Sequence, residues 1–274
     1  MNLEKKKLSV AFVTLATNKY VWYWKNLLLS ADLNLGTNID YTFHVFTDQP
    51  KYCEAASKLV KHVRVIIHEI RPMDWKDATL LRYETINSSK RLINSEIVVH
   101  IDADSLIIKD LSSTFIERDW INGIALVSHP GFWRPKGIAA VNFYIQNIQY
   151  LVRDSLKMVT MGALGTWDTN QNSTAYVARF RRKKYVCGGV WMGERDEIFR
   201  LIEELSNQNR INLENQLHAK WFDESHLNNW AAFHKCTKLT PNYCFAQGYK
   251  NLESFSPIII AVDKKTIFPP SGRI

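Results

Sequence analysis

The stretch "EIVVHIDADSLI" (residues 96–107) decides the fold. An apolar run ends in two aspartates, Asp102 and Asp104, and a second apolar run follows them. The first run is apolar on both faces, which is typical of a central strand in a parallel sheet. Ligands of such sheets bind beyond the carboxyl ends of the strands. We therefore expect both carboxylates to emerge at the ligand-binding edge of the protein.

The sequence around this strand alternates short apolar runs with segments of helical spacing, which predicts an α/β fold. We expect one domain over residues 1–274, with a mostly parallel sheet flanked by helices. The polar, basic segment 161–185 reads as a mobile loop, and the tail from Ser256 as a short strand followed by irregular chain. The predicted strands are 8–16, 41–48, 63–70, 96–102, 123–130 and 185–193, and the predicted helices are 19–31, 52–62, 77–94, 195–211 and 223–235.

The chain is basic, with 35 Lys and Arg against 27 Asp and Glu, a net charge of +8. Such a charge suits an anionic partner: nucleic acid, a phosphate compound or a membrane surface. A nucleic-acid module would interleave aromatic and basic residues, and no such pattern is present. We expect no nucleic-acid partner, while the basic surface would allow peripheral contact with a membrane.

The cysteines and the N-terminus carry little chemistry. The four cysteines form no CxxC pair and have no zinc-like histidine spacing, so reduced thiols are expected. The basic N-terminal stretch 1–10 lacks a following apolar region of signal-peptide length. No apolar run approaches the roughly 20 residues of a membrane span. These observations predict a soluble, cytoplasmic protein with no signal peptide and no membrane anchor.

Asp102 and Asp104 are candidate metal ligands. Residues i and i+2 of an extended segment face the same way, so the two carboxylates can share one hard cation, Mn²⁺ or Mg²⁺. A cation held by two carboxylates takes its other ligands from water and a diphosphate. The alternative is an ordinary turn, because aspartate is common at strand ends.

A second group of polar residues lies in "KWFDESHLNNW" (220–230). Asp223 and Glu224 would begin a helix, where carboxylates are favourable for purely structural reasons. A functional interpretation places a carboxylate near a sugar anomeric carbon and the face of Trp221 under a sugar ring. The spacing alone leaves both interpretations open.

Four stretches in this order resemble glycosyltransferase family 6, the family of the blood-group A and B transferases and of α-1,3-galactosyltransferase. The resemblance covers roughly residues 10–265, and "YVCGGVWMG" (185–193) resembles the Gly-rich strand of the family. With no anchor or stem in the sequence, the chain resembles a soluble bacterial or viral member. The four stretches are "VFTDQP" (45–50), "HIDADSLI" (100–107), "SHPGFW" (128–133) and "KWFDESHLN" (220–228).

The resemblance implies an A-type glycosyltransferase fold with a Rossmann-like nucleotide-binding half over about 8–130. An acceptor-binding half over about 131–255 and a tail over 256–274 would complete the domain. The implied activity is retaining transfer of GalNAc or Gal from a UDP-sugar to O3 of a β-galactoside, in α linkage. Mn²⁺ (or Mg²⁺) would bridge Asp102 and Asp104 to the diphosphate. Glu224 matches the catalytic carboxylate, acting through a glycosyl-enzyme or through same-face attack.

Further residues of this chain match functional positions of the family. The resemblance assigns His129, Trp221 and Phe245 to a galactose-terminated acceptor, with or without fucose. Each matched residue also has a plain structural interpretation, such as core packing or a solvated helix position. An inactive sugar-binding protein, the rival of a different class, would have lost Asp104 or Glu224. The donor-binding matches are Tyr20, Arg82, Asp102, Asp104, Gly188, Gly189, Asp223 and Lys264.

Donor choice in the family follows residues matching Gly131, Cys187 and Gly189, and two glycines there leave room for an N-acetyl group. GalNAc is therefore favoured, with UDP-Gal as the alternative donor. Phe222 stands where the blood-group enzymes have histidine, and "TPNYCFAQ" (240–247) departs from the acceptor segment of the family. These departures leave the acceptor and any fucose requirement open. Arg273 is a second tail residue expected near the diphosphate, and "RFRRKK" (179–184) falls in the expected mobile loop.

Overall fold

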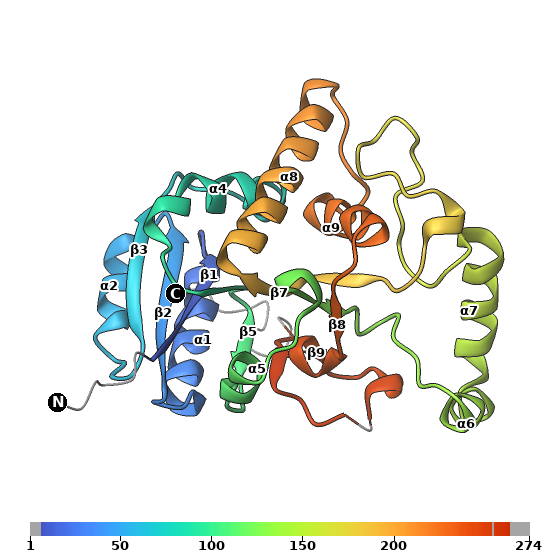
Figure 1. The fold of residues 1–274 in the computed structure, drawn as a ribbon, viewed down its shortest axis with the longest axis horizontal. Helices are drawn as coiled ribbons and strands as arrows, with labels where there is room; N and C mark the ends of the chain where they lie inside the picture. The colour runs from blue at the N-terminus through green and yellow to red at the C-terminus, as the bar shows by residue number, and fades with distance from the viewer. Residues whose placement is uncertain (1–6, 254, 264–274) are drawn as a thin grey trace, which may run out of the picture.

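The computed structural model describes residues 7–253 and 255–263, and its centre is a seven-stranded sheet in the order β3-β2-β1-β4-β7-β6-β8 (Figure 1). The strands run parallel except for β7, which is antiparallel to both β4 and β6. The bounds are β1 Leu8–Leu15, β2 Ile39–Thr47, β3 Arg64–Glu69, β4 Ile97–Ile101, β6 Ile124–Ser128, β7 Val186–Glu194 and β8 Thr237–Leu239.

The predicted α/β class with a mostly parallel sheet is confirmed. Side chains of β1 alternate between the two faces of the sheet, with Val10 and Phe12 in one core cluster and Ala11 and Val13 in the other. Because both faces of the central strands are covered, these strands are apolar throughout rather than alternating. The helices are α1 Tyr20–Asn34, α2 Pro50–Ser57, α3 Trp75–Leu80, α4 Arg82–Ser88, α5 Ser112–Ile116, α6 Ile138–Gln146, α7 Ile148–Met161, α8 Arg195–Glu214 and α9 Phe222–Phe233.

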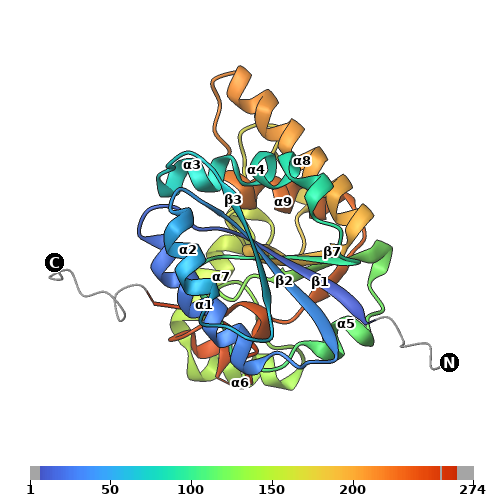
Figure 2. The ribbon, with the colours of Figure 1, turned by 90° about the vertical axis from the view of Figure 1, so that its left-hand side faces the viewer.

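Two layers of helices cover the sheet (Figure 2). Helices α1, α2 and α5 contribute side chains to the core on one face, and α4, α8 and α9 pack on the other. This arrangement brings the N-termini of α4 and α9 toward the end of β4, where the aspartate pair emerges.

Three segments differ from the sequence prediction. The helix expected over 77–94 is two short helices, α3 and α4, that meet at Leu81, and the helix expected over 52–62 ends at Ser57. The sequence pattern predicts no helix or strand over residues 131–160, where the structure has α6 and all but the last residue of α7. The segment 161–185 is irregular as expected, but Trp167 and Asp168 in it are buried. Asp168 accepts hydrogen bonds from the Ser173 hydroxyl and the Lys220 backbone N–H, which fasten the segment to the chain before α9.

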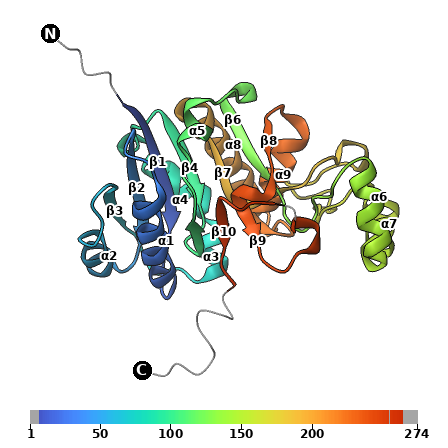
Figure 3. The same ribbon diagram turned by 90° about the horizontal axis from the view of Figure 1, so that it is seen from below.

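The apolar run after the aspartate pair leaves the main sheet. It forms β5 (Ser105–Ile107), which pairs antiparallel with β10 (Ile259–Ala261), and β10 pairs in parallel with β9 (Phe245–Ala246) (Figure 3). The short strand expected after Ser256 is therefore β10. None of the described helices, the 20-residue α8 included, combines the length and apolar composition of a bilayer-spanning segment.

Candidate functional site

Asp102 and Asp104 flank a tight turn at the end of β4. The Asp102 N–H donates to the Gly189 carbonyl at 2.9 Å, and the Ser105 N–H donates back to the Asp102 carbonyl at 3.1 Å. The pair is thus not an extended i, i+2 pair, as the sequence pattern suggested. The turn nevertheless places both aspartates on the wall of one cavity.

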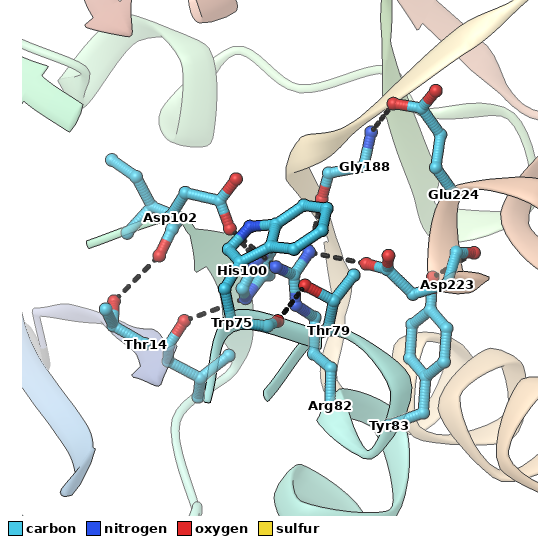
Figure 4. A network of polar contacts seen from close by, with 12 residues as sticks. Thr14, Trp75, Thr79, Arg82, Tyr83, His100, Asp102, Gly188, Asp223 and Glu224 are labelled. Atoms are coloured by element: carbon cyan, nitrogen blue, oxygen red, sulfur yellow. Dashed lines mark hydrogen bonds and ion pairs between the residues drawn. The ribbon is translucent and has the colours of Figure 1, made fainter. Parts of the chain in front are cut away.

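Arg82, the first residue of α4, joins three distant segments (Figure 4). Its Nη2 lies 2.8 Å from Asp102 Oδ1, and its Nη1 lies 2.6 Å from Asp223 Oδ2. Nη1 also donates to the Gly188 carbonyl at 3.1 Å. The guanidinium side chain is only 11% exposed, so Arg82 is a buried ionic junction and not a solvated helix residue. We call Arg82, Asp102, Asp223 and Glu224 the charge cluster.

In this cluster, burial disfavours the charged form of each side chain, and ion pairing favours it. Burial alone would lower the pKa of Arg82, but the Asp102 and Asp223 carboxylates outweigh it and raise that pKa. Burial raises the pKa of Asp223 to about 6, opposed by Arg82 and supported by the charge of Asp102. Arg82 therefore opposes the effect of burial on Asp223 and favours the ionised form of that carboxylate.

Glu224 lies in the first turn of α9, beside the Gly-rich strand β7. Its Oε2 accepts the Gly188 N–H at 2.9 Å. Burial raises the pKa of Glu224 to about 7, the Gly188 N–H lowers it, and the charge of Asp223 raises it. The Tyr185 hydroxyl also lowers it by hydrogen bonding to the carboxylate. Such a carboxyl changes protonation near neutral pH, a property common in catalytic groups.

Two adjoining cavities meet at the charge cluster. One, of about 60 Å³, extends from Asp102 and Asp104 to Tyr20 and Thr17. The other, of about 150 Å³, extends from Asp102 to Trp221, Asp223 and Glu224. Both are lined by Trp75, Thr79, Arg82 and Asp102. A ligand of two parts can therefore lie across Arg82, with one part on each side.

The donor set at the turn suits a hard cation, since carboxylate oxygens are the ligands that Mn²⁺ and Mg²⁺ prefer. Among the described residues, no group of three or more His, Cys, Asp and Glu side chains could hold an ion. A cation at Asp102 and Asp104 would thus need further oxygens from water and a bound ligand. The two carboxylates fit this arrangement.

Close contacts in the structure explain why β7 has glycine at positions 188 and 189. A Cβ on Gly189 would lie 2.8 Å from Asp102 Oδ2, and one on Gly188 would lie 3.2 Å from the Cβ of Glu224. Glycine at these positions lets two carboxylates approach the strand backbone. The space beside Gly189 is filled by Asp102 itself, and Cys187 is buried in the core. A Cβ on Gly131 would contact the His129 ring at 3.3 Å.

Asn228 fixes α9 against β7. Its Oδ1 accepts the Val186 N–H and its Nδ2 donates to the Val186 carbonyl, both at 2.8 Å. Asn228 and His226, both in the stretch 220–230, are buried. Neither ring nitrogen of His226 has a hydrogen-bond partner among the described residues. Asn228 thereby sets the distance between Glu224 and Gly188.

The candidate acceptor residues differ in where they lie relative to the two cavities. Trp221 lines the cavity of Glu224 and is 46% exposed. His129 follows β6; its Nδ1 accepts the Gly131 N–H at 3.0 Å, and burial lowers its pKa to about 4, so the neutral ring carries its proton on Nε2. Phe245 begins β9 and is not among the residues lining the two cavities described above. Lys264 and Arg273 lie outside the described residues.

Two residues of the site were missed in the sequence. His100 Nδ1 donates to the Val13 carbonyl at 3.1 Å, its Nε2 lies 3.3 Å from Asp102 Oδ1, and its ring stacks on Trp191. Trp75 lies over both cavities and contacts Phe222 edge-on at 6.0 Å. His100 was visible as a polar residue inside an apolar strand, whereas Trp75 carried no local signal.

Comparisons with known proteins show that the chain is similar in sequence to glycosyltransferases. The model of glycosyltransferase family 6 matches residues 161–267. "Histo-blood group ABO system transferase 1" of Rattus norvegicus is 24% identical over 243 residues, covering 87% of this chain and 61% of its own length. "O-antigen biosynthesis glycosyltransferase WbnI" of Escherichia coli is 24% identical over 237 residues, covering 86% of this chain and 87% of its own.

"Globoside alpha-1,3-N-acetylgalactosaminyltransferase 1" of Gallus gallus is 21% identical over 241 residues, covering 86% of this chain and 61% of its own length. The chain thus spans about three fifths of the length of the rat and chicken relatives. The α/β architecture is consistent with an A-type glycosyltransferase fold.

Proposed function

We propose that the chain is a member of glycosyltransferase family 6 and that it transfers GalNAc from UDP-GalNAc to O3 of a β-galactoside with retention, forming an α linkage. The observation that carries the proposal is the charge cluster, which joins a cavity lined by Tyr20 and Asp104 to one lined by Glu224 and Trp221. A nucleotide-sugar has two parts, and the reacting bond joins them at the diphosphate.

In this proposal the UDP part occupies the cavity of Tyr20, with the aromatic ring against uracil. Asp102 and Asp104 would hold Mn²⁺ (or Mg²⁺), and such an ion, when bound, neutralises the diphosphate as UDP leaves. Arg82 holds Asp102 in place through its 2.8 Å contact, so the carboxylate is oriented before any ligand arrives. The family resemblance predicts that Lys264 contacts the diphosphate.

The sugar part lies in the second cavity, and Asp223 binds its hydroxyls. Glu224 approaches the anomeric carbon from the side of β7. Two hydrogen-bond donors, the Gly188 N–H and the Tyr185 hydroxyl, favour the ionised carboxylate. An ionised Glu224 serves equally in double displacement and in stabilising an oxocarbenium ion during same-face attack.

The acceptor galactose would stack on Trp221, whose exposed face borders the cavity of Glu224. His129 offers an Nε2–H to an acceptor hydroxyl. Phe245 is the weakest of the three assignments, because it lies in the small sheet.

GalNAc is proposed over Gal because of the small residues at 131 and 189. A larger side chain at Gly189 would displace Asp102, so the glycine is needed whichever donor is used. The donor assignment therefore depends chiefly on Gly131, and UDP-Gal remains the alternative substrate.

Transfer from UDP-GalNAc and UDP-Gal to a β-galactoside, with and without 2′-fucose, tests the proposal in Mn²⁺ and in EDTA. We expect Mn²⁺-dependent transfer of GalNAc, with an α-1,3 linkage visible by NMR. Transfer that survives EDTA would contradict the metal role of Asp102 and Asp104. Transfer of Gal alone would overturn the donor assignment, and UDP release without transfer would overturn the acceptor. Binding of galactosides with no turnover of either donor would indicate a sugar-binding protein instead.

A further inference from the structure

The α6–α7 hairpin exposes its apolar side. The exposed large aliphatic residues recur at helical spacing, which places them on one stripe of each helix. Ile145 is 74% exposed and Val152 is 66% exposed. The stripe consists of Ile138, Val141 and Ile145 on α6 and Ile148, Leu151, Val152, Leu156 and Val159 on α7.

The buried residue of α7 is polar, whereas α6 buries Phe143. Asp154 on α7 is buried, and its two oxygens lie 2.5 and 2.9 Å from Nε and Nη2 of Arg134. The Tyr144 hydroxyl donates to the same carboxylate at 3.1 Å. A helix of a globular protein normally buries its apolar stripe. The reversed orientation of α7, together with the exposed aliphatic residues of both helices, indicates an external partner.

The same part of the chain accounts for nearly all of the net positive charge. Residues 131–184, which we call the basic lobe, contain nine Lys and Arg and two Asp, a net +7 of the +8 of the whole chain. Both aspartates, Asp154 and Asp168, are buried. The basic lobe therefore presents cations and aliphatic side chains to its surroundings, and no exposed carboxylate. Figure 1 shows α6 and α7 at the end of the molecule opposite α2.

The segment "RFRRKK" (179–184) lies at the edge of the apolar stripe. The Arg179 guanidinium donates to the carbonyls of Met158 and Val159 in the last turn of α7. Its neighbour Phe180 is 81% exposed. A cavity of about 370 Å³ opens between this segment and α7, with Arg134, Lys136, Arg182, Lys183 and Lys184 in its lining and no carboxylate. Tyr185, the hydrogen-bond partner of Glu224, lies in the wall of the same cavity.

We infer that the basic lobe docks the protein on an anionic lipid membrane through the apolar stripe of α6 and α7 and the cations of 179–184. Aliphatic side chains flanked by Lys and Arg are the composition of helices that lie in the membrane interface. A second copy of the chain is the competing occupant, and charge argues against it, because it would bring two surfaces of net +7 together. The docking does not depend on which sugar the protein transfers.

Sedimentation with vesicles tests this inference, using phosphatidylcholine alone or mixed with phosphatidylglycerol. The wild-type protein should bind the mixed vesicles at least about tenfold more tightly than the neutral ones, and high salt should weaken binding. Ile145→Glu with Val152→Glu should weaken binding at least about tenfold. The matched control is Leu33→Glu with Leu92→Glu, which changes two exposed leucines outside the basic lobe and should have no effect.

Lys183→Gln with Lys184→Gln tests the charge contribution and should weaken binding about 30-fold, since each cation near an anionic surface contributes about 1 kcal/mol. The control, Lys51→Gln with Lys58→Gln, removes the same charge from α2 and the residue that follows it, and should not weaken binding. Absence of wild-type binding to mixed vesicles, or an equal loss in the controls, would overturn the inference. A dimer in sedimentation velocity that Ile145→Glu with Val152→Glu dissociates, without vesicle binding, would assign the surface to a second copy.

Discussion

The charge cluster and the basic lobe handle charged side chains in opposite ways. In the charge cluster, each carboxylate lies within hydrogen-bond distance of a specific donor, and Arg82 holds Asp102 and Asp223 at 2.8 and 2.6 Å. In the basic lobe, most cations are exposed, and both carboxylates are buried. The first region has its partners inside the protein, so its geometry is set before a ligand binds. The basic lobe has no exposed carboxylate to pair with its exposed cations, so we place its partner outside the protein.

The largest effect should come from changing the group nearest the proposed chemistry. Glu224→Gln keeps the size of the side chain and removes its charge, and we expect transfer to fall about 10⁴-fold. UDP binding, measured by calorimetry, should be unchanged. Glu214→Gln, in an exposed pair with Arg210 on α8, is the matched control and should keep full activity. Transfer by Glu224→Gln near the wild-type rate would remove Glu224 from the mechanism.

The second prediction concerns stability. Arg82→Met leaves the buried Asp223 carboxylate and the partly exposed Asp102 carboxylate without their cation, and the free energy of unfolding should fall by about 3–5 kcal/mol. Arg200→Met breaks a similarly short pair with Glu197 at 2.7 Å, but that arginine is 69% exposed, so the loss should stay below about 1 kcal/mol. Urea denaturation measures both. Equal losses would mean that burial of the charge cluster contributes nothing.

The third prediction is a pH dependence of stability. Folding raises the pKa of Glu224 from 4.5 to about 7, so between these values the folded state binds more protons than the unfolded state. The contribution of Glu224 to the free energy of unfolding therefore falls as the pH rises from about 4.5 to about 7. Glu224→Gln removes this contribution, so its stability relative to wild type should rise by on the order of 2 kcal/mol between pH 5 and pH 7. Parallel stability curves for the two proteins would show that the carboxyl titrates normally.

The smallest effect should come from the basic lobe. Ile145→Glu with Val152→Glu changes outward-facing side chains, so unfolding should shift by no more than about 0.5 kcal/mol. Transfer to a water-soluble acceptor should stay within about twofold of wild type for the same reason. A larger loss of either would mean that the stripe packs against the protein itself, and the contrast between the two regions would disappear.

The part of the site that the sequence predicts well depends on short stretches of chain. The run "VVHID" is a central strand, and the aspartates at its end line a cavity, because burial on both faces leaves an unmistakable apolar pattern. "DESHLNNW" likewise begins a helix at the site. Both follow from local composition.

What the sequence did not give depends on contacts between distant segments. Arg82 reads as a solvated helix residue, and only its partners at 102, 188 and 223 make it a buried junction. Asn228 carries no sign of its two hydrogen bonds to Val186, and Trp75 none of its place over both cavities. The α6–α7 hairpin was missed although its aliphatic residues recur at helical spacing, and only the structure shows that this stripe faces outward.

The junction at Arg82 also bears on when the site forms. The sequence separations of its three contacts are 20, 106 and 141 residues, so the last of them closes only after α9 has been made. Contacts of such long range form late, because the entropy of closing the loop must be overcome first. During synthesis on the ribosome, the emerging chain would have its sheet nucleus of β1, β2 and β4 well before it has a working site. Recovery of transfer activity during refolding is therefore a reporter of the final step of assembly, later than the burial of the tryptophans in the core.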